Sequence, residues 1–429
     1  MRGGLASKLL LLAVSLVTAL TGLEILVRAT DLNFRPLRNN ADTEAILESS
    51  EFHTRVRTNA LGFREPRLPG PKPPGIRRIV ALGDSFTQGY GVEEHEAYPR
   101  VLEGLLDGVE VINLGVGGSC PLDYVANFDE VGRAYEPDLV LVGLMTNDVS
   151  DVFNLRERGT RLLSWMLHEE QDRLTDPRPV WKRLPSRLWP NLYALASLAV
   201  RGRDTGEAPV AQEPQEGRAP RPPLLPRERW KEVLQALMAR YGNADEVERR
   251  LATLPPDRLD RIQTILTVGR KSEEEDQAMS ELMALLEPRY YVDRLELAPK
   301  YAAAWKETTQ LLARIAATAR RIGAETVVVY VPSAPEVVPD RLERFASRGF
   351  EVDGWPARAI LGDRVRQFGE EAGIPVVDLR EPLRAHADEP IYFVRDGHWT
   401  PRGHRVAAEA IASAIRGFRV LGGGGVSLR

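Results

Sequence analysis

Residues 79–89 read Ile-Val-Ala-Leu-Gly-Asp-Ser-Phe-Thr-Gln-Gly, an apolar run followed by a Gly-Asp-Ser turn. A short apolar run that ends in glycine is typical of a buried strand leading into a tight loop. The hydroxyl group of Ser85 is therefore expected at the carboxyl end of a strand, where open α/β sheets form their ligand crevices. Taken alone, a serine at such a place is more often an ordinary loop residue than a nucleophile.

The far end of the chain supplies the partners that a nucleophilic serine needs, because residues 396–401 read Asp-Gly-His-Trp-Thr-Pro. His398 can act as the general base that takes the proton of the Ser85 hydroxyl. Asp396 lies two residues earlier, and in an extended segment such residues point to the same side, so its carboxylate can hold the imidazole. The alternative role for Asp396 is to cap the helix that begins near Pro401, and both roles can hold together.

Apolar runs alternate with helix-like segments on both sides of this motif, which indicates an α/β fold with right-handed crossovers. The expected architecture is a three-layer α/β/α domain with about five parallel strands. The strands are expected at 77–83, 109–114, 138–144, 325–331 and 374–379. The helices of this domain are expected at 98–106, 121–135, up to about 323, 357–372 and 401–415.

The alternation stops between residues 152 and 298, where amphipathic helical runs dominate. These helices are expected at 228–241, 244–254, 256–268 and 272–286. Residues 206–227 are rich in proline and are expected to form a flexible surface loop. Because this helical insertion leaves the sheet just after Asn147, we predict that it could act as a lid over the crevice.

The expected order of segments follows from these patterns. It comprises a membrane anchor or signal at 1–28, a polar, proline-rich lead-in at 29–76, the first part of the core at 77–151, the insertion at 152–298, the second part of the core at 299–417 and a flexible tail at 418–429. The prolines of the lead-in indicate an extended spacer.

The N-terminal residues predict an association with a membrane. Arg2 and Lys8 precede a largely apolar run that continues to Val27 with one interruption, Glu24. A helix that spans a bilayer needs about 20 such residues, so a single-pass anchor is expected. A cleaved signal peptide is the alternative, because small residues occur at 19–22. Either way, the catalytic part is expected outside the cytoplasm, in the periplasm, anchored to the membrane or secreted after cleavage.

Composition excludes several classes of function. The net charge of −4 argues against a nucleic-acid partner. A single cysteine, Cys120, leaves no intrachain disulfide possible. The six histidines, at 53, 95, 168, 386, 398 and 404, do not group like zinc ligands, so we expect neither a metal nor a cofactor.

Three predicted strand ends present Ser85, Gly118 and Asn147 along one edge of the sheet. Acyl transfer needs hydrogen-bond donors aimed at the developing oxyanion, and the backbone N–H groups of Ser85 and Gly118 with the Asn147 amide are suitable donors. The alternative for Asn147 is a turn residue. A dinucleotide-binding loop is excluded, because the third glycine of G-x-G-x-x-G falls on Cys120. Asp84 is expected to brace the turn by hydrogen bonding.

Four blocks of the chain, in this order, resemble the SGNH hydrolase family, the GDSL-type esterases and lipases. The blocks are Gly83-Asp84-Ser85, Asn113-Leu114-Gly115 with Gly118, Asn147-Asp148 and Asp396-Gly397-His398. The second glycine of G-x-S-x-G is missing, which disfavours an ordinary α/β-hydrolase elbow. Upstream, residues 59–64 read Asn-Ala-Leu-Gly-Phe-Arg, which resembles bacterial membrane-anchored members.

The resemblance implies that Ser85 is the nucleophile, that His398 is the base and that Ser85, Gly118 and Asn147 donate to the oxyanion. The chain departs from the family pattern at two positions. Met145 stands where G-x-N-D has its glycine, and Arg395 stands where D-x-x-H has its acid. The D-x-H spacing also occurs in the family, so Asp396 is the expected acid, whereas Asp148 and His404 are expected to be structural.

Three functions are compatible with these residues. The first is a metal-independent esterase or deacetylase that acts on an acyl ester or an acetylated glycan through acyl-Ser85. The second is transfer of the same acyl group to a hydroxyl of a cell-envelope polysaccharide. The third, of another class, is a membrane-anchored binding or assembly protein with a degenerate hydrolase core, which the anchor, the lead-in and the long insertion favour.

Overall fold

The computed structural model describes residues 11–12, 14–23, 26, 34, 36–160, 163–175, 225–268, 273–338, 341–355 and 359–418. The chain divides into two compact units, and the one with residues 36–174 and 214–429 contains the sheet and the candidate site. The other unit comprises residues 1–35 and 175–213. Nearly all of the proline-rich loop at 206–227 and of the tail at 418–429 lies outside the described residues.

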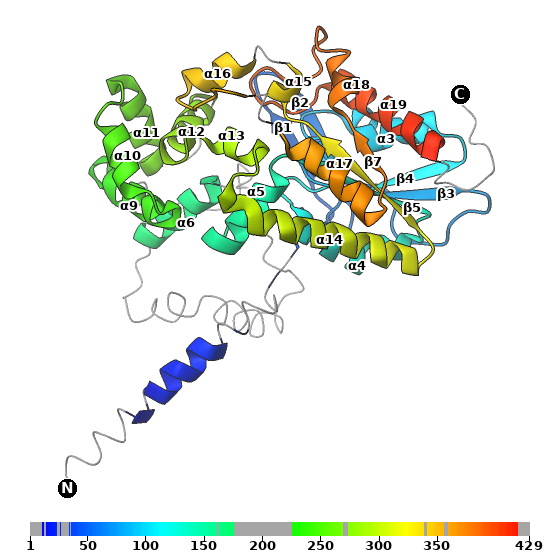
Figure 1. The fold of residues 1–429 in the computed structure, drawn as a ribbon, viewed down its shortest axis with the longest axis horizontal. Coiled ribbons are helices and arrows are strands. Elements are labelled where there is room, and N and C mark those ends of the chain that lie inside the picture. The colour runs from blue at the N-terminus through cyan, green and yellow to red at the C-terminus, as the bar shows by residue number, and fades with distance from the viewer. Residues whose placement is uncertain are drawn as a thin grey trace. The chain divides into compact units, whose positions relative to one another are not determined.

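The core of the larger unit is a five-stranded parallel sheet (Figure 1). Its strands are β3 (Arg77–Leu82), β4 (Val109–Asn113), β5 (Leu139–Met145), β6 (Glu325–Val331) and β7 (Val376–Asp378). Each strand begins and ends within two residues of its predicted range, so the predicted parallel sheet is confirmed. The order β4-β3-β5-β6-β7 is the flavodoxin-like one, and its switch point lies between β3 and β5.

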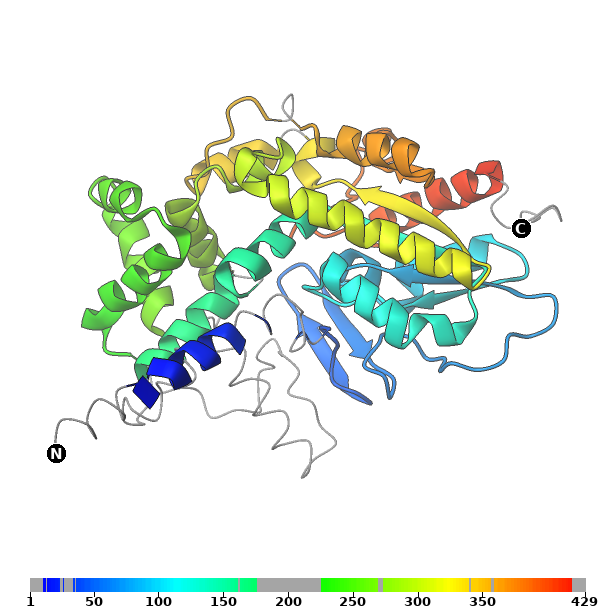
Figure 2. The ribbon, with the colours of Figure 1, turned by 60° about the horizontal axis from the view of Figure 1, so that its bottom comes forward.

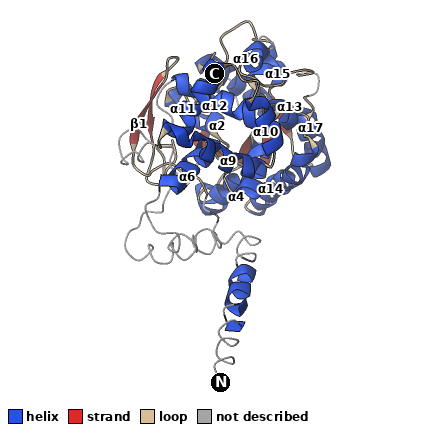
Figure 3. Cartoon of the chain, turned by 90° about the vertical axis from the view of Figure 1, so that its left-hand side faces the viewer, coloured by secondary structure: helices blue, strands red, loops and turns tan. Residues whose placement is uncertain are grey.

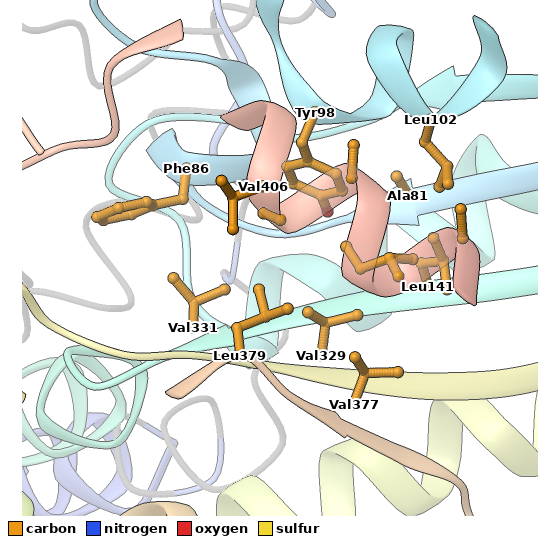
Figure 4. Close-up of a cluster of buried hydrophobic side chains, with 14 of the residues drawn as sticks. Ala81, Phe86, Tyr98, Leu102, Leu141, Val329, Val331, Val377, Leu379 and Val406 are labelled. Atoms are coloured by element: carbon orange, nitrogen blue, oxygen red, sulfur yellow. The ribbon is translucent and has the colours of Figure 1, made fainter. Parts of the chain in front are cut away.

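Helices cover both faces of this sheet, as the three-layer prediction requires. One face packs on α3 (Tyr98–Leu105) and α19 (Pro401–Phe418). The other packs on α14 (Ala302–Arg321) and α17 (Leu361–Ala372), and α4 (Pro121–Glu130) lies beside α14 (Figure 2). In Figure 4 the side chains of Leu141, Val329 and Val377 gather on the α3–α19 side, together with Tyr98 and Val406. Alternate strand residues are buried toward the other layer, because successive side chains of a strand point to opposite faces.

The insertion is helical, as predicted (Figure 3). Its buried side chains form a hydrophobic core of their own. Its helices are α5 (Asp148–Phe153), α6 (Leu163–Thr175), α9 (Trp230–Tyr241), α10 (Ala244–Leu251), α11 (Pro256–Val268), α12 (Glu273–Leu286) and α13 (Tyr290–Leu295). Leu167, Val233, Leu237, Ile262 and Leu282 are among its buried residues. The sequence did not predict α5, α6 or α13. That the insertion acts as a lid stays a prediction.

Short helical turns complete the larger unit. They are α2 (Ser85–Gln88), α15 (Ala334–Val337), α16 (Leu342–Ser347) and α18 (Arg380–Arg384), with single turns at 94–96, 132–135, 154–158, 227–229 and 299–301.

The lead-in differs from the extended spacer expected for it. β1 (Glu44–Glu48) and β2 (His53–Arg57) form an antiparallel hairpin, so that expectation is wrong for these residues. The following Asn-Ala-Leu-Gly-Phe-Arg stretch, 59–64, is a built turn: the Asn59 side chain accepts the N–H groups of two later residues, and Phe63 and Arg64 are buried. Five-residue strands with exposed outer faces have too little apolar alternation to be read from the sequence.

The predicted N-terminal membrane helix falls on residues 1–28, of which only 11–12, 14–23 and 26 are described, and these are helical. In that part of the chain, as in the other described residues, no helix is both long enough and apolar enough to cross a bilayer. The predicted membrane helix therefore has no support from the structure.

Candidate active site

The turn after β3 places the Ser85 hydroxyl at the carboxyl edge of the sheet. The Asp84 carboxylate accepts the N–H of Phe86 at 3.0 Å and caps the short helix α2. A Cβ on Gly83 would lie 2.0 Å from the Thr87 hydroxyl oxygen, so only glycine fits between this strand and this helix. Burial raises the pKa of Asp84, and hydrogen bonds from Phe86 and Asn147 oppose that rise. Hydrogen bonds within the protein therefore hold this turn in place, and Ser85 is the first residue of helix α2.

Ser85, His398 and Asp396 form a continuous hydrogen-bonded line, although 313 residues separate the serine from the histidine. The Ser85 Oγ atom lies 2.7 Å from His398 Nε2. The other ring nitrogen, His398 Nδ1, forms a short hydrogen bond with Asp396 Oδ1, which also accepts the His398 N–H at 3.1 Å. This is the arrangement in which a base removes a serine proton while a carboxylate fixes the tautomer of the base. The His398 side chain keeps 23% exposure, so a substrate can approach the line.

Aromatic rings surround the imidazole and restrict its rotation. The ring centroids of Phe86 and Tyr90 lie 4.8 Å and 4.7 Å from that of His398. The buried Trp399 packs edge-on against Phe86 at 5.0 Å. Both flanking rings belong to the nucleophile side of the site, which therefore helps to orient the base.

The glycine-rich loop after β4 runs directly against helix α2. A Cβ on Gly115 would lie 2.4 Å from the backbone nitrogen of Gln88. The Gln88 side chain in turn accepts the Gly117 N–H at 3.1 Å. Gly118 has a φ of +74°, a left-handed conformation that glycine adopts without a steric cost. The structure therefore brings the loop with the predicted donor Gly118 next to Ser85.

Asn147 lies at the other side of the nucleophile turn, directly after β5. Its Nδ2 atom donates to Asp151 Oδ2 at 2.9 Å, and its buried Oδ1 atom has no hydrogen-bond partner among the described residues. The preceding residue, Thr146, is held by the buried Arg294 of helix α13, whose Nε donates to the Thr146 carbonyl oxygen at 3.2 Å. In this structure the Asn147 amide is hydrogen-bonded to the carboxylates of Asp151 and Asp84, and its donation to an oxyanion stays a prediction.

Replacing Asn147 with alanine is expected to lower kcat by about 10²–10³-fold with a smaller change in KM. An oxyanion donor stabilises charge that develops only in the transition state, and its removal has effects of this size. Steady-state kinetics with an activated acetyl ester measure the effect. Ser150→Ala is the matched control, because it removes a hydrogen bond to the Asn147 carbonyl oxygen but leaves the amide in place. A kcat within threefold of the unsubstituted protein would exclude Asn147 as a donor.

The backbone conformation of Met145 explains why this residue can replace the glycine of the G-x-N-D motif. Asp148 Oδ2 accepts the Met145 N–H at 2.7 Å, and Asp148 Oδ1 accepts the Tyr124 hydroxyl at 2.7 Å. Met145 does not have a positive φ, so this position does not require glycine. Asp148 is fully buried and burial raises its pKa well above the usual range, which agrees with a structural role.

His404 lies apart from the hydrogen-bonded line. Its Nδ1 atom accepts the N–H of Tyr98 at 3.2 Å, and its ring packs against Trp399. Burial lowers the pKa of His404 to about 3. The ring therefore stays neutral over the ordinary working range of pH, as a packing residue would.

This burial predicts a pH-dependent contribution of His404 to stability. The unfolded chain binds a proton at this residue below its ordinary pKa of 6.5, whereas the folded chain does so only near the lowered pKa of about 3. The contribution is present above pH 6.5 and is lost as the pH falls toward 3. Between about pH 6.5 and pH 5 the free energy of unfolding is expected to fall by roughly 2 kcal/mol because of His404, and this fall should be absent in His404→Gln. Urea unfolding at both pH values measures the difference, and parallel profiles for the two proteins would contradict it.

Sequence reasoning missed several residues that hold these loops. They are Asn39, Glu51, Phe52, Gln88 and Tyr90. Gln88 belongs to the stretch that decides the fold, and residues 59–64 mark the lead-in as more than a spacer. These two signals could have indicated that the lead-in packs on the site.

Two protein families match the chain in complementary segments. The family described as "GDSL-like Lipase/Acylhydrolase" matches residues 79–254, which contain Ser85, Gly118 and Asn147. The family described as "SGNH hydrolase-like domain, acetyltransferase AlgX" matches residues 290–425, which contain Asp396 and His398.

Two curated proteins are similar to parts of the chain. "Alginate biosynthesis protein AlgX" of Pseudomonas aeruginosa is 29% identical over 115 residues, which are 27% of this chain and 23% of that protein. "Probable alginate O-acetylase AlgJ" of Pseudomonas syringae pv. tomato is 33% identical over 97 residues, 22% of either chain. The chain therefore spans less than a quarter of the length of each relative.

Among solved structures, an acetylxylan esterase from Geobacillus stearothermophilus has a TM-score of 0.33 and 13% identity, covering 82% of this chain and 97% of that one. A lipase/acylhydrolase from Enterococcus faecalis has a TM-score of 0.30 and 11% identity, covering 80% of this chain and 97% of that one. The family assignment rests on the two family matches and on the site itself. The first match contains the Gly-Asp-Ser, glycine-loop and Asn-Asp blocks, and the second contains the Asp-Gly-His block. The chain therefore belongs to the SGNH hydrolase family.

Proposed function

We propose that this protein transfers an acyl group from an ester through an acyl-Ser85 intermediate, and that water is the usual acceptor, which makes it an esterase or deacetylase. Ser85 is the nucleophile, His398 the general base and acid, and Asp396 the residue that orients and stabilises the imidazole. The single observation that carries this proposal is the hydrogen-bonded line from Ser85 Oγ through both nitrogens of His398 to Asp396.

The proposed reaction has two steps. In the first, His398 Nε2 takes the Ser85 proton while Oγ attacks the ester carbonyl, and the resulting oxyanion is stabilised by the N–H groups of Ser85 and Gly118 and by the Asn147 amide. The oxyanion collapses, the imidazolium protonates the departing alkoxide and an alcohol leaves. In the second, His398 removes a proton from water, which attacks the acyl-Ser85 carbonyl, and the carboxylic acid leaves as Ser85 recovers its proton.

The proposed substrate is an O-acetylated glycan. The printed names of the two curated relatives connect those proteins with alginate, and one of them with its O-acetylation. These likenesses cover only a part of either protein, so they support the class of substrate for this chain without identifying the polymer.

A second candidate is transfer of the acetyl group to a polysaccharide hydroxyl instead of to water. The observation that favours it is the match of residues 290–425, which hold the proposed acid and base, to a family whose description includes an acetyltransferase. Hydrolysis and transfer share acyl-Ser85 and differ only in what attacks it.

Acyl esters of rising chain length, run beside an acetylated polysaccharide, test the first proposal with the full-length protein. We expect turnover of acetyl esters above that of longer ones, release of acetate from the glycan and stoichiometric labelling of Ser85 by a fluorophosphonate. Absence of both turnover and labelling would overturn the proposal. A partner captured through residues 152–298 would then favour the binding or assembly function.

Product analysis separates the two acceptors. The protein is incubated with an acetyl donor ester and a deacetylated oligosaccharide, and free acetate and acetylated oligosaccharide are quantified by mass spectrometry. Acetate alone supports the esterase, whereas acetyl groups that appear on the oligosaccharide in a Ser85-dependent manner support the transferase.

We further propose that the reaction takes place outside the cytoplasm, either anchored at the membrane or after secretion. The basic-flanked apolar run at the N-terminus supports this proposal. Cell fractionation tests it: recovery of the full chain in the cytoplasmic fraction alone would contradict it.

A further inference from the structure

The tip of the β1–β2 hairpin, residues 49–52, is hydrogen-bonded to the loop between Tyr392 and Trp399, which carries the proposed acid and base. The Glu51 carboxylate accepts three consecutive backbone N–H groups, those of Val394, Arg395 and Asp396, at 2.5, 2.7 and 3.0 Å. Consecutive N–H groups that converge on one anion form a nest, and hydrogen bonds to an ionised carboxylate are stronger than neutral ones. More than 340 residues of sequence lie between the carboxylate and the amides that it binds.

The loop that Glu51 grips lies outside regular helices and strands. It is closed by the Tyr392–Trp399 bridge, and between these residues it turns at Gly397, whose φ is +88°. The Val394 side chain is 61% exposed and contributes little packing. Besides the bridge, the Phe393 N–H donates to the His398 carbonyl oxygen at 2.8 Å, and Arg341 donates to the carbonyl oxygens of Phe393 and Val394. The N–H groups of residues 394–396 are bound by Glu51, so this contact contributes to the fixed geometry of the loop. One of the three bonds from Glu51 is to the backbone of Asp396, the residue whose carboxylate holds His398 Nδ1.

A second contact from the hairpin tip reaches both sides of the site. The Phe52 ring lies 5.1 Å from that of Phe393, at the start of the acid–base loop. It also lies 5.4 Å from Tyr90, whose ring packs on the His398 imidazole. The residue next to Glu51 therefore packs between the loop and one of the rings that orient the base.

Residues on either side of the hairpin are hydrogen-bonded to the end of helix α2, the helix that begins at Ser85. The buried Arg64 donates from Nη1 to the carbonyl oxygen of Gly89 at 2.6 Å and from Nη2 to that of Arg55, in β2, at 2.9 Å. Gln88 donates to the Asn39 side chain at 3.2 Å. One continuous stretch of chain is thus bonded to the end of helix α2 and to the Asp396 loop.

From these contacts we propose that the β1–β2 hairpin aligns the two halves of the active site, and that Glu51 is a positioning residue for Asp396 and, through it, for His398. Glu51 does not touch the reacting atoms. It holds the backbone from which the acid projects, so its loss leaves all three proposed catalytic residues present but less accurately placed. The expected change in kcat rests on the proposed function. The hydrogen bonds between Glu51 and residues 394–396 do not depend on that function.

The test compares Glu51→Gln, Glu51→Asp and Glu48→Gln in the full-length protein. Glutamine has the shape of glutamate but offers one acceptor oxygen without charge to three N–H groups, so Glu51→Gln is expected to lower kcat by roughly 10–100-fold with KM changed less than threefold, because small misplacements have effects of this size. Fluorophosphonate labelling of Ser85 should slow by a similar factor. Glu51→Asp, which keeps the charge, should recover part of the loss. Glu48→Gln is the matched control, because this carboxylate lies on the same hairpin, is 76% exposed and lies 3.7 Å from His53 Nδ1, on the neighbouring strand.

Hydrogen exchange supplies a readout that does not require activity. In Glu51→Gln the amides of residues 394–396 should exchange faster, while exchange in the sheet and the melting temperature stay near those of the unsubstituted protein. Unchanged kcat and unchanged exchange at 394–396 would overturn the proposal, as would a loss no larger than that of Glu48→Gln. Uniformly faster exchange with a lower melting temperature would also overturn it, since that result describes a general stabilising role. If the unsubstituted protein has no esterase activity, the proposed function fails, and the local exchange result alone decides whether Glu51 holds the loop.

Discussion

Replacing Ser85 with alanine is expected to lower the turnover of an activated acetyl ester by at least about 10⁴-fold, the largest effect of any single substitution in this protein. Nucleophilic serines in comparable hydrogen-bonded lines account for losses of this order or more, because without the hydroxyl no acyl-enzyme can form. The remaining rate would come from the oxyanion donors and from binding. Initial rates with p-nitrophenyl acetate and the disappearance of fluorophosphonate labelling measure the effect.

Ser119 provides the control for this substitution. It lies on the neighbouring glycine-rich loop, is fully buried, and donates from Oγ to the carbonyl oxygens of Gly83 and Val116 at 3.1 and 2.6 Å. Its hydroxyl is engaged by the backbone and does not face the base, so Ser119→Ala should keep most of the activity. Turnover of Ser85→Ala within tenfold of the unsubstituted protein, at an unchanged melting temperature, would show that another group carries the reaction.

Replacing Asp396 with asparagine is expected to lower kcat by about 10³–10⁴-fold at neutral pH. The carboxylate accepts a hydrogen bond from His398 Nδ1 and stabilises the imidazolium that forms when Nε2 takes the Ser85 proton. An asparagine carries no charge, and its amide N–H group favours the wrong tautomer of the ring. Steady-state kinetics over a range of pH measure the effect, and activity should recover in part at high pH, where stronger external bases assist.

A second carboxylate–histidine pair in the same region is the control for Asp396. Glu389 Oε1 lies 2.7 Å from His386 Nδ1, and its other oxygen bonds to Arg402. Glu389→Gln removes a comparable pair that has no contact with Ser85, so it should leave kcat within about threefold. If Asp396→Asn lowered kcat no more than Glu389→Gln does, Asp396 would have only a structural role, as in the helix-capping alternative that the sequence leaves open.

The sheet could be predicted from the sequence because its signals are local. Each strand is an apolar run with its own terminators, as the run from Ile79 to Gly83 shows, and burial on both faces makes such runs nearly continuous. The four blocks with chemical side chains are equally local. Their order along the chain, with parallel strands, indicated that the loops after β3, β4 and β5 meet at one edge, where the structure has them.

The hairpin and its hydrogen bonds to the loop that carries Asp396 could not be predicted in this way. The groups that Glu51 binds are backbone N–H groups of residues 394–396, which carry no side-chain signature. Glu51 itself looks like any charged residue of a polar lead-in. Likewise, nothing in the sequence around Asn147 indicates that Arg294, from the insertion, donates to the residue before it.

By itself, therefore, the amino-acid sequence determined the five strands, the helical insertion and the side chains capable of acyl transfer, because periodicity and short motifs depend on neighbouring residues. Only the tertiary structure decided that Ser85 and His398 lie 2.7 Å apart and that a segment near residue 50 holds the loop near residue 395. Those distances result from the packing of α19 and the hairpin around the sheet. Contacts made by backbone groups hundreds of residues apart exist only once the chain has folded.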